Sequence, residues 1–218
     1  MGQYYKPTLI GARGKIRWLY SHEYNNGLKL MEHSYIGNNF VNAVLSQILD
    51  HPMKLAWIGD YSPDVYKREW GGEPYQKMEH DKFVQLFSKI WGGENSDDET
   101  KIHPLPLSGF ENIKDFDGWY LVNHTQKIYI SMTAYMKRNK WRESYTNRKT
   151  GATERWDMCV NPLPLLTACG NGRGGGDYYS GHPDYDKVGS WAFDRIEFTS
   201  NKPDDYQEVN YHFTEQEG

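Results

Sequence analysis

The chain has 218 residues, enough for one domain, residues 1–218, with a core of normal size. Only 38% of the residues are hydrophobic, but 15% are aromatic, including 17 Tyr and 8 Trp. Aromatic rings bury large areas and keep a polar group to place, so this composition excludes a disordered chain and suits a pocket in which rings stack. The formal net charge of −4 argues against a protein that coats duplex nucleic acid or an anionic membrane.

Cysteine content and hydropathy indicate the compartment. Two cysteines, Cys159 and Cys169, are too few for a disulfide scaffold or a thiolate zinc site. The sequence shows no signal peptide and no apolar run of about 18 residues. It therefore predicts a cytoplasmic protein whose thiols are reduced.

The first predicted elements are strands over residues 4–10 and 15–20, joined by a glycine-containing turn. A helix is predicted over residues 39–50, because apolar residues recur on one stripe after an asparagine cap, and Pro52 ends the pattern. Residues 54–58 read as a buried strand. The early chain thus alternates strand and helix.

Asp60 follows the strand predicted over residues 54–58 and places a carboxylate at its C-terminal end. Ser62-Pro63-Asp64 predicts the start of a short helix, with proline at its first position. A second long helix is predicted with Asp81 as its cap and Gly92-Gly93 as its end. Residues 94–99 are predicted to be a mobile loop.

The C-terminal half reads mainly as strands. Residues 119–122 and 127–131 alternate in polarity around a turn and predict an antiparallel hairpin. Residues 163–167 and 191–198 predict two further strands on either side of a glycine-rich segment. This order predicts an α+β fold: a single domain with a mostly antiparallel sheet and two main amphipathic helices packed on it.

The glycine-rich segment runs from Gly170 to Tyr179 and holds five glycines in seven residues. A backbone without Cβ atoms can approach a ligand closely and turn its N–H groups toward an anion. The segment also satisfies the pattern G-x-G-x-x-G, but loop residues follow it instead of a helix, and only about forty residues remain, which excludes a dinucleotide-binding Rossmann unit. A phosphate-binding loop of the Gly-Lys-Ser/Thr type is absent as well.

We therefore predict a cradle for a phosphate or carboxylate, in which Arg173 donates charge-assisted hydrogen bonds, Tyr178 and Tyr179 stack on the ligand, and Asp194 braces Arg173. The alternative is a wide glycine turn with Arg173 merely exposed. The predicted ligand-binding residues are Gly172, Arg173, Gly174, Gly175, Gly176, Asp177, Tyr178, Tyr179, Asp194 and His124.

Other candidate residues are weaker. His33, His124 and His182 could each act as a general acid or base, although a histidine in a turn is more often structural. The stretch from His182 to Asp186 could offer ligands to a divalent cation, with Asp177 and either His124 or Asp60, but a polar loop explains it better. We predict no catalytic residue, metal or cofactor.

A basic run covers residues 137–149, with Trp141 and Tyr145 between its charges. It would suit a base or a phosphate. The alternative is a solvated hairpin or loop, the usual structure of a charge run.

Several segments carry a resemblance to a known family. They are Met-Gly-Gln-Tyr-Tyr at residues 1–5, Lys-Leu-Met-Glu-His-Ser at 29–34, Leu-Val-Asn-His-Thr at 121–125, and Pro-Leu-Leu-Thr-Ala with Gly-Asn-Gly-Arg-Gly-Gly-Gly-Asp-Tyr within 164–178. In these segments the chain resembles a family of uncharacterised bacteriophage and prophage proteins. The resemblance implies a setting in the host cell cytoplasm and supplies no activity.

Phages encode compact proteins that capture or cleave the nucleotide signals of bacterial immunity, such as cyclic oligonucleotides and cyclic ADP-ribose derivatives. Phosphate donors and aromatic rings without a convincing catalytic set predict a sponge, an anti-defence protein that binds a nucleotide-derived small molecule. A phosphodiesterase or glycohydrolase acting on such a signal is the first alternative, and a protein-binding inhibitor of a host factor is the second. A sponge gains by forming its site between subunits, so a homo-oligomer is favoured.

Overall fold

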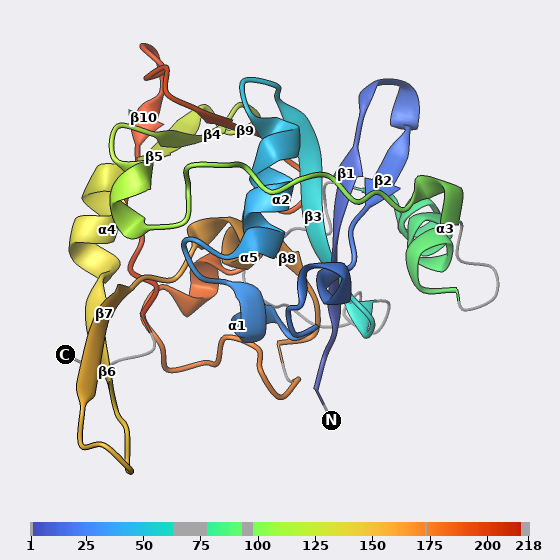
Figure 1. The fold of residues 1–218 in the computed structure, drawn as a ribbon. Coiled ribbons are helices and arrows are strands. Elements are labelled where there is room, and N and C mark those ends of the chain that lie inside the picture. The colour runs from blue at the N-terminus through green and yellow to red at the C-terminus, as the bar shows by residue number, and fades with distance from the viewer. Residues whose placement is uncertain (1, 63–77, 93–97, 173, 215–218) are drawn as a thin grey trace.

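The computed structural model describes residues 2–62, 78–92, 98–172 and 174–214, and it confirms the α+β prediction. A large sheet forms the centre of the molecule, and a separate hairpin projects from it (Figure 1). The strands of the large sheet are β1 (Tyr5–Ile10), β2 (Ile16–Trp18), β3 (Met53–Gly59), β4 (Tyr120–Asn123), β5 (Ile128–Ser131), β8 (Ala168–Cys169), β9 (Arg195–Thr199) and β10 (Gln207–Glu208).

The large sheet is mostly antiparallel, as predicted. Its strand order is β10-β5-β4-β9-β3-β1-β2, and β8 also pairs with β3. Among the described strands, the parallel pairs of this sheet are β10 with β5 and β8 with β3. Because β9 pairs with the start of β3 and β8 with its end, β3 has neighbours along both edges.

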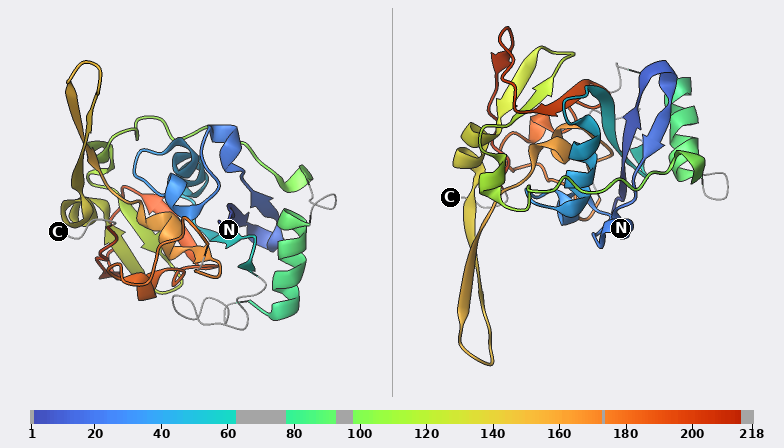
Figure 2. Two further views of the ribbon diagram at one scale, coloured as in Figure 1. Left: turned by 90° about the horizontal axis from the view of Figure 1, so that it is seen from below. Right: turned by 45° about the horizontal axis from the view of Figure 1, so that its top comes forward.

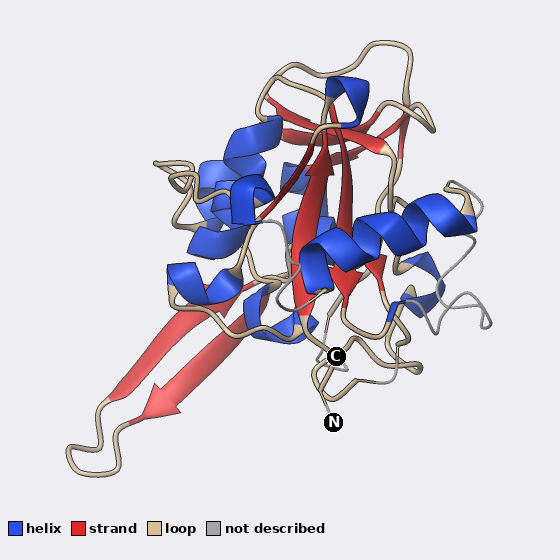
Figure 3. Cartoon of the chain, turned by 90° about the vertical axis from the view of Figure 1, so that its right-hand side faces the viewer, coloured by secondary structure: helices blue, strands red, loops and turns tan. Residues whose placement is uncertain are grey.

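Both faces of β3 are covered, which explains its uninterrupted apolar sequence. Leu55 and Trp57 point into the core that contains helix α2 (Asn39–Ile48), whereas Ala56 and Ile58 belong to a second cluster with helix α3 (His80–Trp91). Successive side chains of a strand point to opposite faces, so one short run contributes to two cores. In Figure 3, α3 crosses in front of the sheet.

The helices of the described chain are α1 (Leu30–His33), α2 (Asn39–Ile48), α3 (His80–Trp91), α4 (Met132–Asn139) and α5 (Pro162–Leu166). Short 3-10 turns lie at Ala12–Gly14, Ser21–Tyr24, Asp98–Thr100, Ile113–Phe116 and Tyr185–Lys187. Helix α2 matches its prediction, because the Asn38 side chain accepts hydrogen bonds from the backbone N–H groups of Phe40 and Val41.

The predicted cap of α3 was wrong. The helix begins at His80 with Glu79 at the cap position, so Asp81 lies in the first turn. A carboxylate is favoured there by the exposed N–H groups of the helix end, which is why it resembled a cap in the sequence. The predicted end at Gly92 is confirmed.

The strand predicted over residues 163–167 was also wrong, since this segment forms α5. Pro162 occupies the first turn of that helix, and the Asn161 side chain accepts a hydrogen bond from the N–H of Leu163 at 3.0 Å. Asparagine followed by proline is a helix-start signal, and here it outweighs the apolar run. The strand predicted over residues 191–198 begins only at Arg195, after a turn that includes Asp194.

Other predictions were closer. The two N-terminal strands and the hairpin of β4 and β5 are confirmed, although β2 is shorter than predicted. Pro63, Asp64 and most of the loop predicted over residues 94–99 lie outside the described residues. None of the described helices is long and apolar enough to cross a membrane.

The second sheet is an arm. Among the described strands, β6 (Trp141–Thr146) and β7 (Thr153–Met158) pair only with each other, and they extend away from the body of the protein in every view (Figures 1, 2 and 3). The basic run at residues 137–149 covers the last turn of α4, strand β6 and the start of the hairpin loop. Residues 141–146 of this run are thus a hairpin strand and residues 137–139 are helical, and contact of the run with a phosphate stays a prediction.

Candidate functional site

The glycine segment encloses the N-terminus of the chain. Gly2 pairs with Gly175 in a parallel bridge, and the side chains of Gln3 and Tyr5 are completely buried. Oε1 of Gln3 accepts a hydrogen bond from the backbone N–H of Asn171 at 3.0 Å and lies 2.9 Å from the Tyr5 hydroxyl oxygen. The segment is therefore bound to the first strand of the sheet.

This close packing explains two of the glycines. A Cβ atom on Gly174 would lie 2.3 Å from Cβ and 2.4 Å from the backbone nitrogen of Gln3. Gly176 has a φ of +90°, and a Cβ atom there would lie 2.6 Å from Cδ of Lys29. Glycine is thus required by sterics and by backbone conformation, independently of any ligand.

Several amides of the segment bind its own side chains. The N–H of Gly174 donates to Oδ2 of Asp177 at 2.8 Å, and the N–H of Gly176 donates to the Tyr179 hydroxyl at 3.0 Å. The Asp177 carboxylate, only 2% exposed, thus lies where we expected the anion of a ligand. These contacts favour the structural alternative for the segment, and its use as a ligand cradle stays a prediction.

Asp177 is electrostatically unusual. Burial raises the pKa of its carboxyl to about 6, against the hydrogen bonds from Tyr5 and Gly174, which lower it, and the nearby charge of Asp60 raises it further. The Tyr5 hydroxyl lies 2.9 Å from Oδ1. Burial also raises the pKa of Asp60, whose Oδ1 accepts from the N–H of Tyr4 at 3.1 Å.

The remaining predicted cradle residues are dispersed. Tyr178 is only 1% exposed and packs edge-on against Phe213, so it does not offer its ring to a ligand, contrary to our prediction. Tyr179 is 45% exposed. Asp194 accepts hydrogen bonds from the side-chain amides of Asn123 at 2.8 Å and Gln126 at 2.7 Å. Arg173, its predicted partner, lies outside the described residues.

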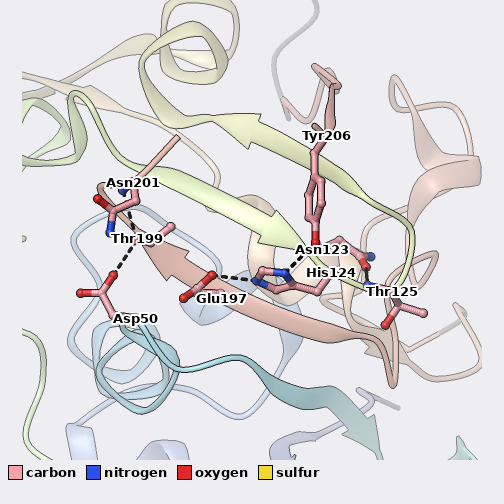
Figure 4. A network of polar contacts seen from close by, with 8 residues as sticks. All are labelled: Asp50, Asn123, His124, Thr125, Glu197, Thr199, Asn201 and Tyr206. Atoms are coloured by element: carbon pink, nitrogen blue, oxygen red, sulfur yellow. Dashed lines mark hydrogen bonds and ion pairs between the residues drawn. The ribbon is translucent and has the colours of Figure 1, made fainter. Parts of the chain in front are cut away.

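His124 belongs to a different polar network, on the sheet (Figure 4). Its Nε2 lies 2.7 Å from Oε2 of Glu197 on the neighbouring strand β9, and its Nδ1 lies 3.0 Å from the hydroxyl of Tyr206. The two side chains of this ion pair are 24% and 16% exposed, so solvent reaches them. A carboxylate, an imidazole and a hydroxyl in this order are the components of a proton relay.

The other histidines have structural contacts. His33 is fully buried, donates from Nδ1 to the Gly27 carbonyl at 3.1 Å, and accepts at Nε2 from the Trp57 indole at 3.0 Å. Burial lowers the pKa of His33 to about 4, which fits a neutral ring in the core. His182 packs against Tyr178. Within the described ranges, no three His, Cys, Asp or Glu side chains are placed to hold a metal ion.

A groove with a basic rim lies at the base of the arm. Its volume is about 530 Å³, and Lys114, Lys137 and Lys140 line it from three places in the chain: a 3-10 turn, α4 and the residue before β6. Asp117 and Asp157 also line it, and Lys140 is 3.4 Å from Asp157.

The sequence pointed to part of this lysine groove. Lys137 and Lys140 belong to the basic run, whereas Lys114 carried no signal because only the fold brings it to the same surface.

No protein-family model, curated protein or solved structure matches this chain.

Replacing Gly174 with Ala is expected to destabilise the fold by about 1–3 kcal/mol, because the added methyl group collides with the backbone of Gln3. Gly175→Ala is the matched control, since its Cβ would meet nothing closer than 3.9 Å. Denaturant unfolding of both variants measures the difference. Equal stability of the two would contradict the packing role of the segment.

The raised pKa of Asp177 predicts a pH dependence of stability. A folded pKa of about 6, above the unfolded value near 3.8, means that the native state holds this proton more tightly. The stabilisation of the folded state by this protonated carboxyl is complete below pH ~4 and is lost as the pH rises through ~6.

Measured against Asp177→Asn, the free energy of unfolding of the wild type should fall by roughly 3 kcal/mol between pH 4 and 7, at about 1.4 kcal/mol per pKa unit. Tyr5→Phe removes a donor to the carboxylate, so the midpoint of this fall should move to higher pH. The same pH profile in wild type and Asp177→Asn would refute the assignment.

Proposed function

We propose that this protein binds a phosphate-bearing, nucleotide-derived small molecule without converting it, and that the ligand lies in the lysine groove at the base of the arm. The proposal keeps the function expected from the sequence and moves its site. The single observation that carries it is the convergence of Lys114 with Lys137 and Lys140 on one groove.

The position of Lys114 is the strongest support. Lys137 lies in the last turn of α4, where a cation is favoured by the helix dipole in any case. That effect does not explain Lys114, which reaches the groove from a separate 3-10 turn. Neither Lys114 nor Lys137 has an ion pair with a described residue.

The groove also has the size and composition for such a ligand. Its volume of about 530 Å³ lies within the usual range for small-molecule sites, roughly 300–1,000 Å³. Ile113 and Met136 provide apolar surface beside the lysines. Phosphates bind ammonium groups, and the flat face of a base packs on apolar side chains.

The biological setting of the proposal comes from the phage resemblance. A protein that sequesters a nucleotide signal of bacterial immunity needs tight binding and no chemistry. A homo-oligomer would suit this role and remains part of the proposal.

Lys114→Gln with Lys137→Gln should weaken binding at least about tenfold per lysine, since each charge-assisted contact contributes about 1.5–3 kcal/mol. Isothermal titration calorimetry with cyclic dinucleotides, cyclic trinucleotides and cyclic ADP-ribose measures it. Lys15→Gln with Lys89→Gln, both exposed and outside the groove, is the matched control. Binding should also weaken with added salt, because the groove is open to solvent.

Two outcomes would contradict this assignment. The absence of binding to every nucleotide in the panel would reject the function. Unchanged binding by the Lys114 and Lys137 variant would reject the lysine groove as the site and leave the glycine segment as the candidate.

A hydrolase is the second candidate, because His124 lies between a carboxylate and a hydroxyl. If the N–H at Nε2 of His124 donates a hydrogen bond to Glu197, the Nδ1 atom carries no proton. Nδ1 would then accept a hydrogen bond from the Tyr206 hydroxyl and could take up its proton as a general base.

If the protein is a hydrolase, ligand recovered after incubation and denaturation of the protein should be cleaved by the wild type and intact with His124→Gln, with binding affinity unchanged. Intact ligand with both proteins supports the binding function.

A further inference from the structure

The arm has two unlike faces. Residues directly opposite each other in an antiparallel ladder share a face, and neighbours along a strand alternate. The pairing of β6 with β7 therefore defines an aromatic face made of Trp141, Glu143, Tyr145, Glu154, Trp156 and Met158. It also defines a polar face made of Arg142, Ser144, Thr146, Thr153, Arg155 and Asp157.

Several side chains of the polar face form hydrogen bonds or ion pairs with one another. The hydroxyls of Thr146 and Thr153 are 2.9 Å apart, and Nε of Arg142 is 3.5 Å from Oδ1 of Asp157. Such cross-strand pairs are typical of a face that stays in water.

The aromatic face, by contrast, exposes large rings to solvent. Tyr145 is 57% exposed and Trp156 is 43% exposed, although both are large rings. Near the base, Trp141 packs edge-on against Tyr35, so only that end of the face reaches the body. A two-stranded ribbon with no other strand beside it is marginally stable in water, and exposed rings on it mark a contact surface.

The aromatic face leads into a second groove on the body. This groove has a volume of about 460 Å³, and Trp156 and Met158 from the arm line it together with Ile36 and Ile113. Its polar lining consists of Glu111, Asn112, Lys114 and Asp157, so carboxylates outnumber the one lysine. The arm and the body thus form a continuous surface whose apolar side chains can hold the anchors of an extended or helical segment.

The charge of the aromatic face indicates which kind of partner it can bind. The two charged side chains on the aromatic face, Glu143 and Glu154, are both carboxylates. Glu143 accepts a hydrogen bond from the Trp141 indole at 2.8 Å, whereas Glu154 has no ion pair within the described part of the chain. Carboxylates repel nucleic-acid phosphates and anionic lipids and attract lysine and arginine.

We propose that the aromatic face and the adjoining groove dock a segment of a partner protein whose apolar anchors are flanked by Lys or Arg. This docking surface uses the opposite side of the arm from the one that carries Arg142 and Arg155. The adjoining groove shares Ile113, Lys114 and Asp157 with the lysine groove. The docking proposal rests on the aromatic face, however, and the residues changed to test it differ from the lysines above.

The test is a selection of random peptides displayed on yeast, with the full-length protein as bait. Peptides enriched by the wild type should combine Trp, Phe or Leu with Lys or Arg. A synthetic peptide of that sequence, followed by fluorescence anisotropy, should bind Tyr145→Ala with Trp156→Ala at least about tenfold more weakly, because each aromatic anchor contributes on the order of 2 kcal/mol. Glu154→Lys should weaken binding as well.

Ser144→Ala with Arg155→Ala is the matched control, because these two residues face each other on the polar side of the same ladder and should leave binding unchanged. All changes are on exposed side chains, and circular dichroism verifies the fold of each variant.

Three outcomes overturn the proposal. The first is a lack of enriched peptides, or enrichment of acidic ones. The second is equal loss of binding in the aromatic and control variants. The third is a concentration-dependent dimer in sedimentation velocity that the Tyr145 and Trp156 changes abolish, because a second copy would then be the occupant.

Discussion

The burial of the N-terminal segment under the glycine segment is the constraint on which much of this structure depends. Gln3 is buried only because Gly174 has no side chain beside its backbone, and Gly170 leaves room for the Tyr5 hydroxyl in the same way. Tyr5 begins β1, which pairs along its length with the central strand β3. The glycine segment therefore secures the edge of the sheet to which the first strands belong.

This contact changes the meaning of the most distinctive motif in the sequence. Amides turned toward an anion are present, but the anion at Gly174 is the carboxylate of Asp177. An internal carboxylate in such a place needs no ligand, and its raised pKa shows what burial costs the charged form. The N-terminal residues and the glycine segment are also in direct contact, through the bridge of Gly2 with Gly175 and the hydrogen bond from Asn171 to Gln3.

The arm is the feature most open to partners. Its base brings together lysines from α4 and from a distant 3-10 turn, and its aromatic face continues into an apolar groove. The two grooves adjoin, because Ile113, Lys114 and Asp157 line both. They differ in their other residues: Lys137 and Lys140 line the first, whereas Trp156 and Met158 of the aromatic face line the second.

The sequence by itself determined the elements with strong local signals. The amphipathic helix α2 with its Asn38 cap, the buried run of β3 and the hairpin of β4 and β5 follow from periodicity and turn residues. The strand predicted over residues 163–167 was wrong because a short apolar run fits a strand as well as a buried helix. The Asn161 cap and Pro162 in the first turn favour the helix.

Only the tertiary structure decided which surfaces are available. Local sequence indicated that Tyr178 and Gly174 could face a ligand, but distant segments cover both: Gln3 packs beside Gly174, and Phe213 packs against the ring of Tyr178. The grouping of Lys114 with Lys137, and of His124 with Glu197 and Tyr206, likewise arises from packing between distant elements. Local propensity acts over a few residues, whereas a site is made of contacts that chain folding brings together.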